Sequence, residues 1–493
     1  MILCWDDQAD AVATVISKKP TDSNPLAISV VRSCGPRQFL MPIETVAAAR
    51  RWSDGWRGGL LGTCEFDRGF YAPWVEEARR AVGADAVLLV DPAAGLVDPR
   101  LLDQLVKHAN ANPEVDFCFS PAAPGLNGVL VRAALLEQLS ISKTHPGVLL
   151  TYRPEIPRRD PIADPACVST PIPLNRTTRR FTLDSTRQIE LISSATAHLN
   201  GQLISIDAMG LLAAVEKSAG VDPSPRELIL ELNTERATRP IYMPHDIHRA
   251  EMKLDTARAL LKDLAKRDDA RLVLAGVGDP MLHDGVIEII RGARDAGISA
   301  ISVETDFVGV PSERVAALAD AGADIVSVHI PAATSATYAA VMGKDALAEV
   351  IGNLRTFIDR RQALGRELPL LLPTFTKCRS NQGEMEAWYD HWLKTVGSAV
   401  IAGPSDFAGL IEDVSAADMS PPRRRPCNSL WKRLTALSDG TIVSCEQDVT
   451  ARQALGSGLG QAWNAAESLR RDHRAERWCD HAACAACKHW HRP

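Results

Sequence analysis

The stretch RLVLAGVGDPMLHDGVIEIIRGARDAGISAISV, residues 271–303, sets the fold class of this chain. It predicts a strand over 271–276, a helix over Gly285–Ala296 and a second strand over 299–303, because two short apolar runs flank apolar residues at helical spacing. Strands joined by a crossover helix run parallel. The stretch therefore predicts a β-α-β unit in a parallel α/β sheet.

The same alternation continues on both sides of this unit. Further strands are predicted at 228–233, 323–330, 369–375 and 398–403, and further helices at 254–266, 312–321, 346–362 and 384–394. Six consecutive units of this kind predict a (β/α)6 partial barrel over residues 223–420, with its site at the carboxyl ends of the strands.

The residues before this region form a second α/β pattern. Strands are predicted at 27–31, 86–90 and 115–119, helices at 100–109 and 206–217, and a strand followed by a helix within 179–199. A proline-rich loop over 151–165 interrupts the pattern, and a Gly/Pro/Ser segment at 218–225 closes it. We expect an N-terminal domain over residues 1–222.

The last 73 residues, 421–493, have a different composition and are expected to form a third domain. They carry 12 Lys and Arg against 7 Asp and Glu, which gives +5, whereas the whole chain has a net charge of −6. Asp439 and Gly440 predict a hairpin turn between two short strands. Five of the chain's 11 cysteines lie here: Cys427, Cys445, Cys479, Cys484 and Cys487.

This cysteine cluster predicts a metal centre. In a reducing compartment clustered cysteines are more often metal ligands than disulfide partners. Cys484 and Cys487 form a C-x-x-C turn that presents two sulfurs to one site, and a distant cysteine pair completes the set. The spacing fits an iron-sulfur cluster or a zinc knuckle of similar geometry.

Composition excludes several classes of protein. The chain of 493 residues is 46% hydrophobic and 24% charged, which is typical of folded multidomain proteins. Its net charge of −6 gives no general reason to bind nucleic acid or anionic membrane. It contains no apolar run long enough for a membrane span, and Asp6 and Asp7 interrupt the place of a signal peptide, so we expect a cytoplasmic protein.

GVGDPMLH, beginning at Gly276, resembles the G-x-G-E-P-L-L-H motif of radical S-adenosylmethionine enzymes. SVETDFVGV, VSVHIPAATSATYAAVMG and RSNQGEMEAWYDHW resemble further segments of that family. The resemblance implies that S-adenosylmethionine is a possible cofactor, bound by Gly276, Gly278, Asp279 and Pro280. Asp279 stands where the family has Glu. A tight β-α turn without a ligand needs the same glycines.

One departure from that family concerns its chemistry. The family's C-x-x-x-C-x-x-C loop reads RATRPIYMP here, so the cysteine positions fall on Arg236, Pro240 and Met243. Since thiolates hold [4Fe-4S] clusters, we expect no catalytic cluster and no radical cleavage. The nearby His245 and His248 could bind a metal, or they could be a surface pair.

PCNSLWKRLTALSDGTIVSCEQD, residues 426–448, resembles the SPASM module that follows many radical S-adenosylmethionine domains. The resemblance implies an auxiliary [4Fe-4S] cluster and favours iron-sulfur over zinc. The implied ligands are Cys427, Cys445, Cys484 and Cys487, with Cys479 as an alternative.

DAVLLVDPAAGLVDP, starting at Asp85, and FTLDSTRQIELI, starting at Phe181, resemble sugar-nucleotide cytidylyltransferases. The resemblance implies a Rossmann-like nucleotidyltransferase-type domain. Asp91 and Asp98 hold the matching places of that family's D-x-P-L-x-D-P segment, whose first Asp helps to bind metal and nucleotide. The family's phosphate-gripping loop, which ends in Lys, is missing, so transfer would lose its electrostatic stabilisation. We expect a retained fold without catalysis, and the catalytic residues are unknown.

The combination of these three parts resembles the spiro-SPASM proteins. It implies an iron-sulfur protein with one C-terminal [4Fe-4S] cluster and without radical cleavage, acting as a binding or redox partner. The alternative is an S-adenosylmethionine-dependent enzyme that modifies a peptide or a sugar-nucleotide-derived substrate. We expect a small-molecule or peptide substrate, or a redox or enzyme partner, and neither nucleic acid nor membrane.

Overall fold

The computed structural model divides the chain into two compact units, Met1–Gly220 and Val221–Pro493. It describes residues 2–3, 72, 76, 79–80, 84–89, 94, 96–142, 165–177, 179–183, 185–197, 206–218, 222–366 and 368–492. In these residues no helix is long and apolar enough to cross a bilayer.

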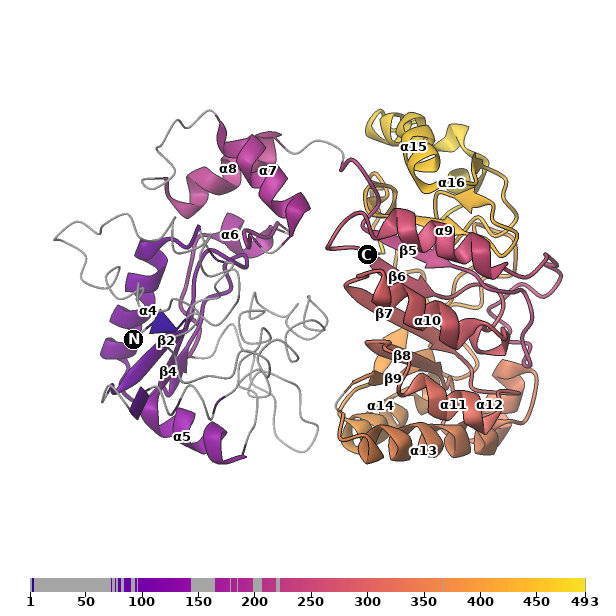
Figure 1. Ribbon diagram of the computed structural model, residues 1–493, viewed down its shortest axis with the longest axis horizontal. Coiled ribbons are helices and arrows are strands. Elements are labelled where there is room, and N and C mark those ends of the chain that lie inside the picture. The colour runs from indigo at the N-terminus through magenta and orange to yellow at the C-terminus, as the bar shows by residue number, and fades with distance from the viewer. Residues whose placement is uncertain are drawn as a thin grey trace. The chain divides into compact units, whose positions relative to one another are not determined.

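The first unit has a four-stranded sheet in the order β1-β2-β4-β3 (Figure 1). β1 and β2 are parallel, and β4 pairs antiparallel with both β2 and β3. The strands are β1 (Ile2–Leu3), β2 (Ala86–Leu89), β3 (Phe117–Cys118) and β4 (Val129–Arg132), and the helices are α4 (Pro99–Ala111), α5 (Ala133–Ser142), α6 (Ile172–Arg176), α7 (Thr186–Thr196) and α8 (Ala208–Ser218).

Two of the predicted strands in this unit, at 86–90 and 115–119, are confirmed by β2 and β3, and the predicted helices by α4, α7 and α8. The strand predicted ahead of α7 is wrong, because residues 179–183 are irregular. Phe181 is buried there, and its backbone N–H donates to Pro124 O at 2.8 Å in a loop rather than in a strand ladder. The strand predicted at 27–31 lies outside the described residues.

The second unit has a nine-stranded sheet in the order β10-β9-β8-β7-β6-β5-β11-β12-β13. Its first six strands are all parallel and lie in chain order. They are β5 (Glu227–Leu230), β6 (Arg271–Leu274), β7 (Ala300–Thr305), β8 (Ile325–His329), β9 (Leu370–Thr376) and β10 (Val400–Ala402). The six strands predicted from residue 228 onward are confirmed.

Helices connect these parallel strands, as predicted (Figure 1). They are α9 (Leu254–Leu264), α10 (Val286–Asp295), α11 (Ser312–Leu318), α12 (Ser335–Met342), α13 (Leu347–Ala363) and α14 (Met385–Val396), with the short η6 (Pro280–Leu282) and η7 (Gln382–Glu384). Closure of the sheet into a partial barrel stays a prediction.

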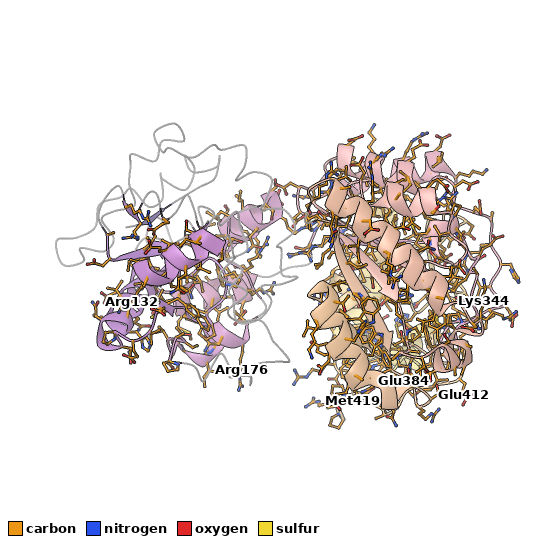
Figure 2. The ribbon with its side chains drawn as sticks, turned by 90° about the horizontal axis from the view of Figure 1, so that it is seen from below. Arg132, Arg176, Lys344, Glu384, Glu412 and Met419 are labelled. Carbon is orange, nitrogen blue, oxygen red and sulfur yellow. The ribbon has the colours of Figure 1, made fainter. Side chains whose placement is uncertain are left out.

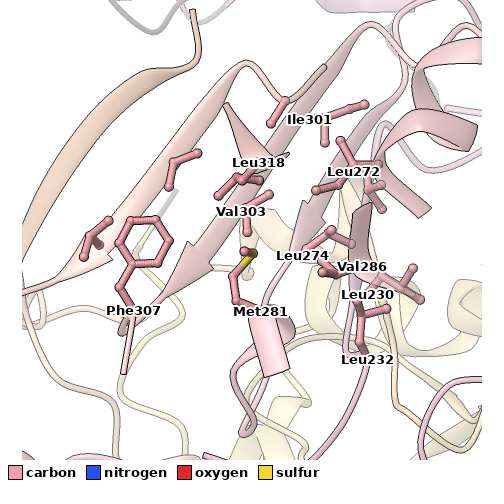
Figure 3. Packing of buried hydrophobic residues seen from close by; sticks show 14 of the residues in the cluster. Leu230, Leu232, Leu272, Leu274, Met281, Val286, Ile301, Val303, Phe307 and Leu318 are labelled. Carbon is pink, nitrogen blue, oxygen red and sulfur yellow. The ribbon is translucent and has the colours of Figure 1, made fainter. Parts of the chain in front are cut away.

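The core of this unit explains why the helices lie against the sheet. α10 buries Val286, Ile289, Ile290 and Ala293, which recur at the spacing of one helix face. In Figure 3 the side chain of Met281 lies among residues of β6 and β7 such as Leu274 and Val303. The apolar residues that recur in 271–303 therefore pack together in one continuous core.

The tail continues the same sheet. β11 (Arg433–Ala436) runs parallel to β5, and β12 (Ile442–Val443) and β13 (Ala454–Gly456) follow antiparallel. The predicted hairpin at Asp439 and Gly440 is confirmed. The remaining tail elements are η8 (Asn428–Trp431), α15 (Leu459–Arg474), η9 (Trp478–Asp480) and α16 (Ala482–Ala485). The separate domain over 421–493 stays a prediction.

Candidate functional site

Polar side chains gather at the carboxyl ends of β5 to β8. Glu231 follows β5, Asp279 follows β6, Asp306 follows β7, and His329 is the last residue of β8. Because parallel strands end at one edge of a sheet, these side chains meet there. Glu231, Asp279 and Asp306 are almost completely buried.

Arg236, which follows β5, occupies the centre of this edge. Its Nη1 forms an ion pair with Asp306 Oδ1 at 2.6 Å, and its side chain is 8% exposed. The guanidinium also donates to Val277 O at 3.1 Å, Gly278 O at 3.1 Å and Gly276 O at 3.4 Å. Burial alone would lower the pKa of Arg236, but the carboxylates of Asp306 and Asp279 outweigh burial and raise it. Arg236 is therefore a buried, permanently charged cation.

Asp306 links this cation to a histidine. Its Oδ1 also contacts His329 Nδ1 at 3.0 Å, and Thr238 Oγ1 donates to its Oδ2. Burial would raise the pKa of Asp306, but Arg236 and His329 lower it further than burial raises it. For His329, burial acts in the opposite direction and lowers the pKa. The contact with Asp306 and the charges of Asp306 and Glu304 outweigh burial and raise the pKa of His329 above its usual value.

The glycine motif after β6 is packed tightly against the residues after β5. A Cβ on Gly276 would lie 2.5 Å from Glu231 Cγ, and one on Gly278 would lie 2.1 Å from Asn233 Oδ1. Asn233 Nδ2 donates to Asp279 O at 2.9 Å. Both glycines are required by the close approach of two chain segments.

The carboxylate of Asp279 is hydrogen-bonded within the chain. Its Oδ2 accepts from Thr305 Oγ1 at 2.9 Å and from Asp306 N–H at 2.8 Å, and its Oδ1 accepts from Met281 N–H at 2.9 Å. Burial and the neighbouring charge of Asp306 raise its pKa. Pro280 begins η6 and is buried. The four residues predicted to bind S-adenosylmethionine are adjacent, but much of their hydrogen-bonding capacity is used internally.

The three positions that the sequence resemblance aligns with cluster cysteines do not fit an iron-sulfur cluster. Arg236 is ion-paired, Pro240 is buried, and Met243 packs in an apolar cluster with Val277 and Phe407. A guanidinium has no lone pair to give to iron, and proline offers no side-chain donor. Of the nearby histidines, His245 is half-buried with a pKa lowered by burial, and His248 is exposed.

The tail brings four of its five cysteines together. Cys427 and Cys484 pack in one apolar cluster with Leu430, and Cys487 N–H donates to Cys484 O at 3.2 Å. Burial raises the pKa of all four thiols, and the charge of a neighbouring ionised sulfur adds to this rise for Cys445, Cys484 and Cys487. The two causes together raise the pKa of Cys484 to about 12. Cys445 is repelled by both Cys427 and Cys484.

Cys479 is set apart from this group, because it is exposed and is not among the charges that act on the four thiols. In the described part of the chain, no three His, Cys, Asp or Glu side chains are arranged to hold a metal ion. Four buried or half-buried thiols are nevertheless the donor set that a [4Fe-4S] cluster requires, so the residue types present fit that group.

Basic and aromatic side chains surround the four cysteines. Arg424 Nη2 donates to Cys484 O at 2.7 Å, and its guanidinium lies 5.1 Å from the ring centre of Trp478. Cys427 N–H donates to Nδ1 of the buried His473 at 3.3 Å. The Arg424 charge favours ionised sulfur, because it acts to lower the pKa of Cys484 and Cys487.

In the first unit, Asp98 has a structural role. Its Oδ1 caps α4 by accepting from Arg100 N–H at 2.9 Å, and its Oδ2 accepts from Ala208 N–H at 2.8 Å. Asp91, which matches the metal-binding and nucleotide-binding Asp of the D-x-P-L-x-D-P motif, lies outside the described residues.

Three residues at the sheet edge were not predicted from the sequence: Glu231, Asp306 and His329. Arg236 was named in the sequence analysis only as the residue that stands at a position where the radical S-adenosylmethionine family has a cysteine. One signal was present, since an ionisable residue ends or follows each of β5 to β8. That signal does not reveal which of these residues interact, because the ion pair between Arg236 and Asp306 depends on the path of the loop after β5.

No family model matches this chain. An uncharacterized protein of Treponema pallidum (strain Nichols) is 25% identical over 250 residues, covering 48% of this chain and 69% of the relative.

Among solved structures, SuiB of Streptococcus suis bound to the precursor peptide SuiA is 11% identical, with a TM-score of 0.44, covering 56% of this chain and 79% of SuiB. BtrN in complex with AdoMet and 2-DOIA is 12% identical, with a TM-score of 0.36, covering 52% of this chain and 91% of BtrN.

Proposed function

We propose that this chain is an iron-sulfur protein that holds one [4Fe-4S] cluster on Cys427, Cys445, Cys484 and Cys487 and acts as a binding or redox partner. The observation that carries the proposal is that these four buried or half-buried thiols act electrostatically on one another, whereas Cys479 is exposed. The resemblance of residues 426–448 to the SPASM module supports iron over zinc.

The chain's own residues would prepare this site for a negatively charged group. A bound cluster supplies one-electron transfer. Arg424 places a positive charge beside Cys484, and Trp478 and Leu430 pack in the same apolar cluster as Cys427 and Cys484. Because burial raises the thiol pKa values, loading the site would release protons from the four sulfurs.

The sheet edge would not support radical cleavage. Arg236 brings a fixed positive charge to the position where the resemblance places the first cluster cysteine. We infer that this cation takes over the structural role of holding the carboxyl edge together, and that the redox chemistry of the chain belongs to the tail.

Iron content and electron paramagnetic resonance of paired cysteine variants test the tail site. After anaerobic purification, we expect about four irons per chain in the wild type and in Cys479→Ala, and a reducible cubane signal in both. Cys484→Ala should lose the signal and most of the iron. Equal iron in the two variants would refute the ligand set, and bound zinc in place of iron would refute the cluster.

The second candidate is an enzyme that uses S-adenosylmethionine at Gly276, Gly278, Asp279 and Pro280 and modifies a peptide or a sugar-nucleotide-derived substrate. The resemblance of this motif and its position at the carboxyl edge support it. Titration calorimetry with S-adenosylmethionine tests it. Saturable heat would favour this candidate, and its absence would remove the cofactor.

For the first unit we propose a nucleotidyltransferase-like fold that has lost catalysis. The use of both Asp98 oxygens within the fold supports this proposal. Pyrophosphate release with CTP and sugar acids tests it, and sustained turnover would overturn it.

A further inference from the structure

A cavity of about 220 Å³ lies at the carboxyl ends of the last two parallel strands. Ala402, the last residue of β10, and Lys377, the first residue after β9, line its base. Residues 415–420 form another part of the wall, and Lys488, His489, His491 and Arg492 line it as well. Ligands of parallel α/β sheets bind at this edge of the strands, so the position itself favours a binding site.

In the described part of the chain, one of the cations that line the cavity is available for a ligand. Lys488 is paired with Asp413 at 2.9 Å, and Arg492 donates to Gly403 O at 3.0 Å and to Pro404 O at 3.2 Å. Among the described residues, the ammonium of Lys377 has neither an ion-pair nor a hydrogen-bond partner, although its backbone N–H donates to Ala402 O at 2.8 Å. A fixed backbone therefore carries an unpaired positive charge at the cavity.

The cavity also carries acidic and imidazole groups. Asp418, which lines it, accepts from Ser420 N–H at 2.9 Å and is exposed. Nδ1 of His491 is buried without a hydrogen-bond partner within the described part of the chain. Counting Lys377, Lys488 and Arg492 against Asp413 and Asp418 leaves one net positive charge on the lining.

Apolar side chains form the rest of the wall. Ile401 is 39% exposed and Met419 is 74% exposed, and both line the cavity. Met419 lies at the rim of the second unit in Figure 2. Large exposed apolar side chains next to a concave site are typical of ligand contacts.

We propose that this cavity binds a small carboxylate with an apolar body, with Lys377 pairing with the carboxylate and Ile401 and Met419 contacting the body. The volume suits a single small group rather than a nucleotide. The carboxylate could belong to a free acid or to the carboxyl terminus of a peptide. This site is independent of the cluster proposal, because none of its contacts requires iron.

Fluorine NMR of the full chain tests the site. The probes are 4-fluorophenylacetate for a free acid, N-acetyl-4-fluorophenylalanine for a peptide terminus, and 4-fluorophenylacetamide as the neutral control. We expect saturable broadening with at least one of the two acids, and at least about tenfold weaker binding of the amide, because a charge-assisted hydrogen bond is lost. Equal binding of the amide, or no saturable binding of either acid, would overturn the proposal.

Two variants locate the site, with one matched control. Lys377→Met should weaken binding of the acid at least about tenfold, whereas Lys394→Met on α14 should leave it unchanged. Ala417→Phe changes an exposed residue that lines the cavity and should block binding without affecting folding. Undiminished binding by both Lys377→Met and Ala417→Phe would place the probe elsewhere and refute the site.

Discussion

Arg236 illustrates how one residue can change the chemistry of a sheet edge. It neutralises Asp306, which is 1% exposed, and it donates to three backbone carbonyls of the glycine motif. A buried ion pair is weak evidence for net stability. Removing one partner, however, leaves the other charge buried without compensation and lowers the free energy of unfolding. The cation is therefore needed once the carboxylates are in place.

Replacing Arg236 by Met should destabilise the second unit by about 3–5 kcal/mol, because Asp306 would lose its main counter-charge. The measurement is the midpoint of urea unfolding of the wild type and the variant, with circular dichroism as the signal of unfolding. Arg239→Met is the matched control, since Arg239 lies three residues away and is exposed. It should change the free energy of unfolding by no more than about 0.5 kcal/mol. Equal midpoints for the two variants would contradict the role given to Arg236.

His329 should make the stability of this edge depend on pH. Its folded-state pKa is raised by Asp306 and Glu304, so ionised His329 stabilises the fold. This contribution is fully present below the unfolded pKa of about 6.5 and is lost as the pH rises through the folded pKa. The difference in unfolding free energy between wild type and His329→Gln should therefore be larger at low pH than at high pH. Urea titrations on both sides of neutrality measure it, and a difference that grows with pH would be inconsistent with this sign.

At the scale of elements, the turn after β6 is fixed by close packing. Gly278 approaches Asn233 so closely that a methyl group has no room. Gly278→Ala should cost about 1–3 kcal/mol from overpacking. The control is Gly292→Ala in α10, where no atom lies within 4 Å and the helix should gain about 0.5–1 kcal/mol. Thermal unfolding of both variants measures these changes, and a Gly278→Ala variant as stable as wild type would show that the turn has room.

The helices and strands of the second unit could be predicted because the local apolar pattern agrees there with the tertiary packing. The strands β5 to β9 are packed against helices that follow at regular spacing, so local pattern and tertiary packing give the same answer, whereas the edge strand β10 is largely exposed. The strand predicted before α7 failed for the opposite reason. Phe181 is apolar and buried, but its backbone bonds to a loop, and the sequence carries no sign of that partner.

The extension of the sheet into the tail also could not be predicted. β11 pairs with β5 across more than two hundred residues, with Leu434 opposite Leu228. Short strands such as β12 and β13 have too few residues for a periodic signal. Only the hairpin turn at Asp439 and Gly440 left a local signal, and that turn was predicted.

For the whole molecule, the two candidate sites differ in how much the sequence revealed. The four cysteines of the tail are recognisable by spacing, and in the structure the charges of neighbouring sulfurs act on one another, but their ligation of one metal site stays a prediction. The edge network of Arg236, Asp306 and His329 depends on contacts between residues far apart in the chain, for which spacing carries no information. The sequence therefore identifies the cysteines of the tail as candidate ligands, and the structure shows which contacts Arg236 makes at the sheet edge.

The most direct test of this account is a single anaerobic assay on the reconstituted wild-type chain, in which iron is counted and 5′-deoxyadenosine is measured after adding S-adenosylmethionine and dithionite. The account predicts about four irons per chain and no deoxyadenosine, because the proposed ligands are the four tail thiols and Arg236 occupies the sheet edge. About eight irons per chain together with deoxyadenosine formation would contradict it.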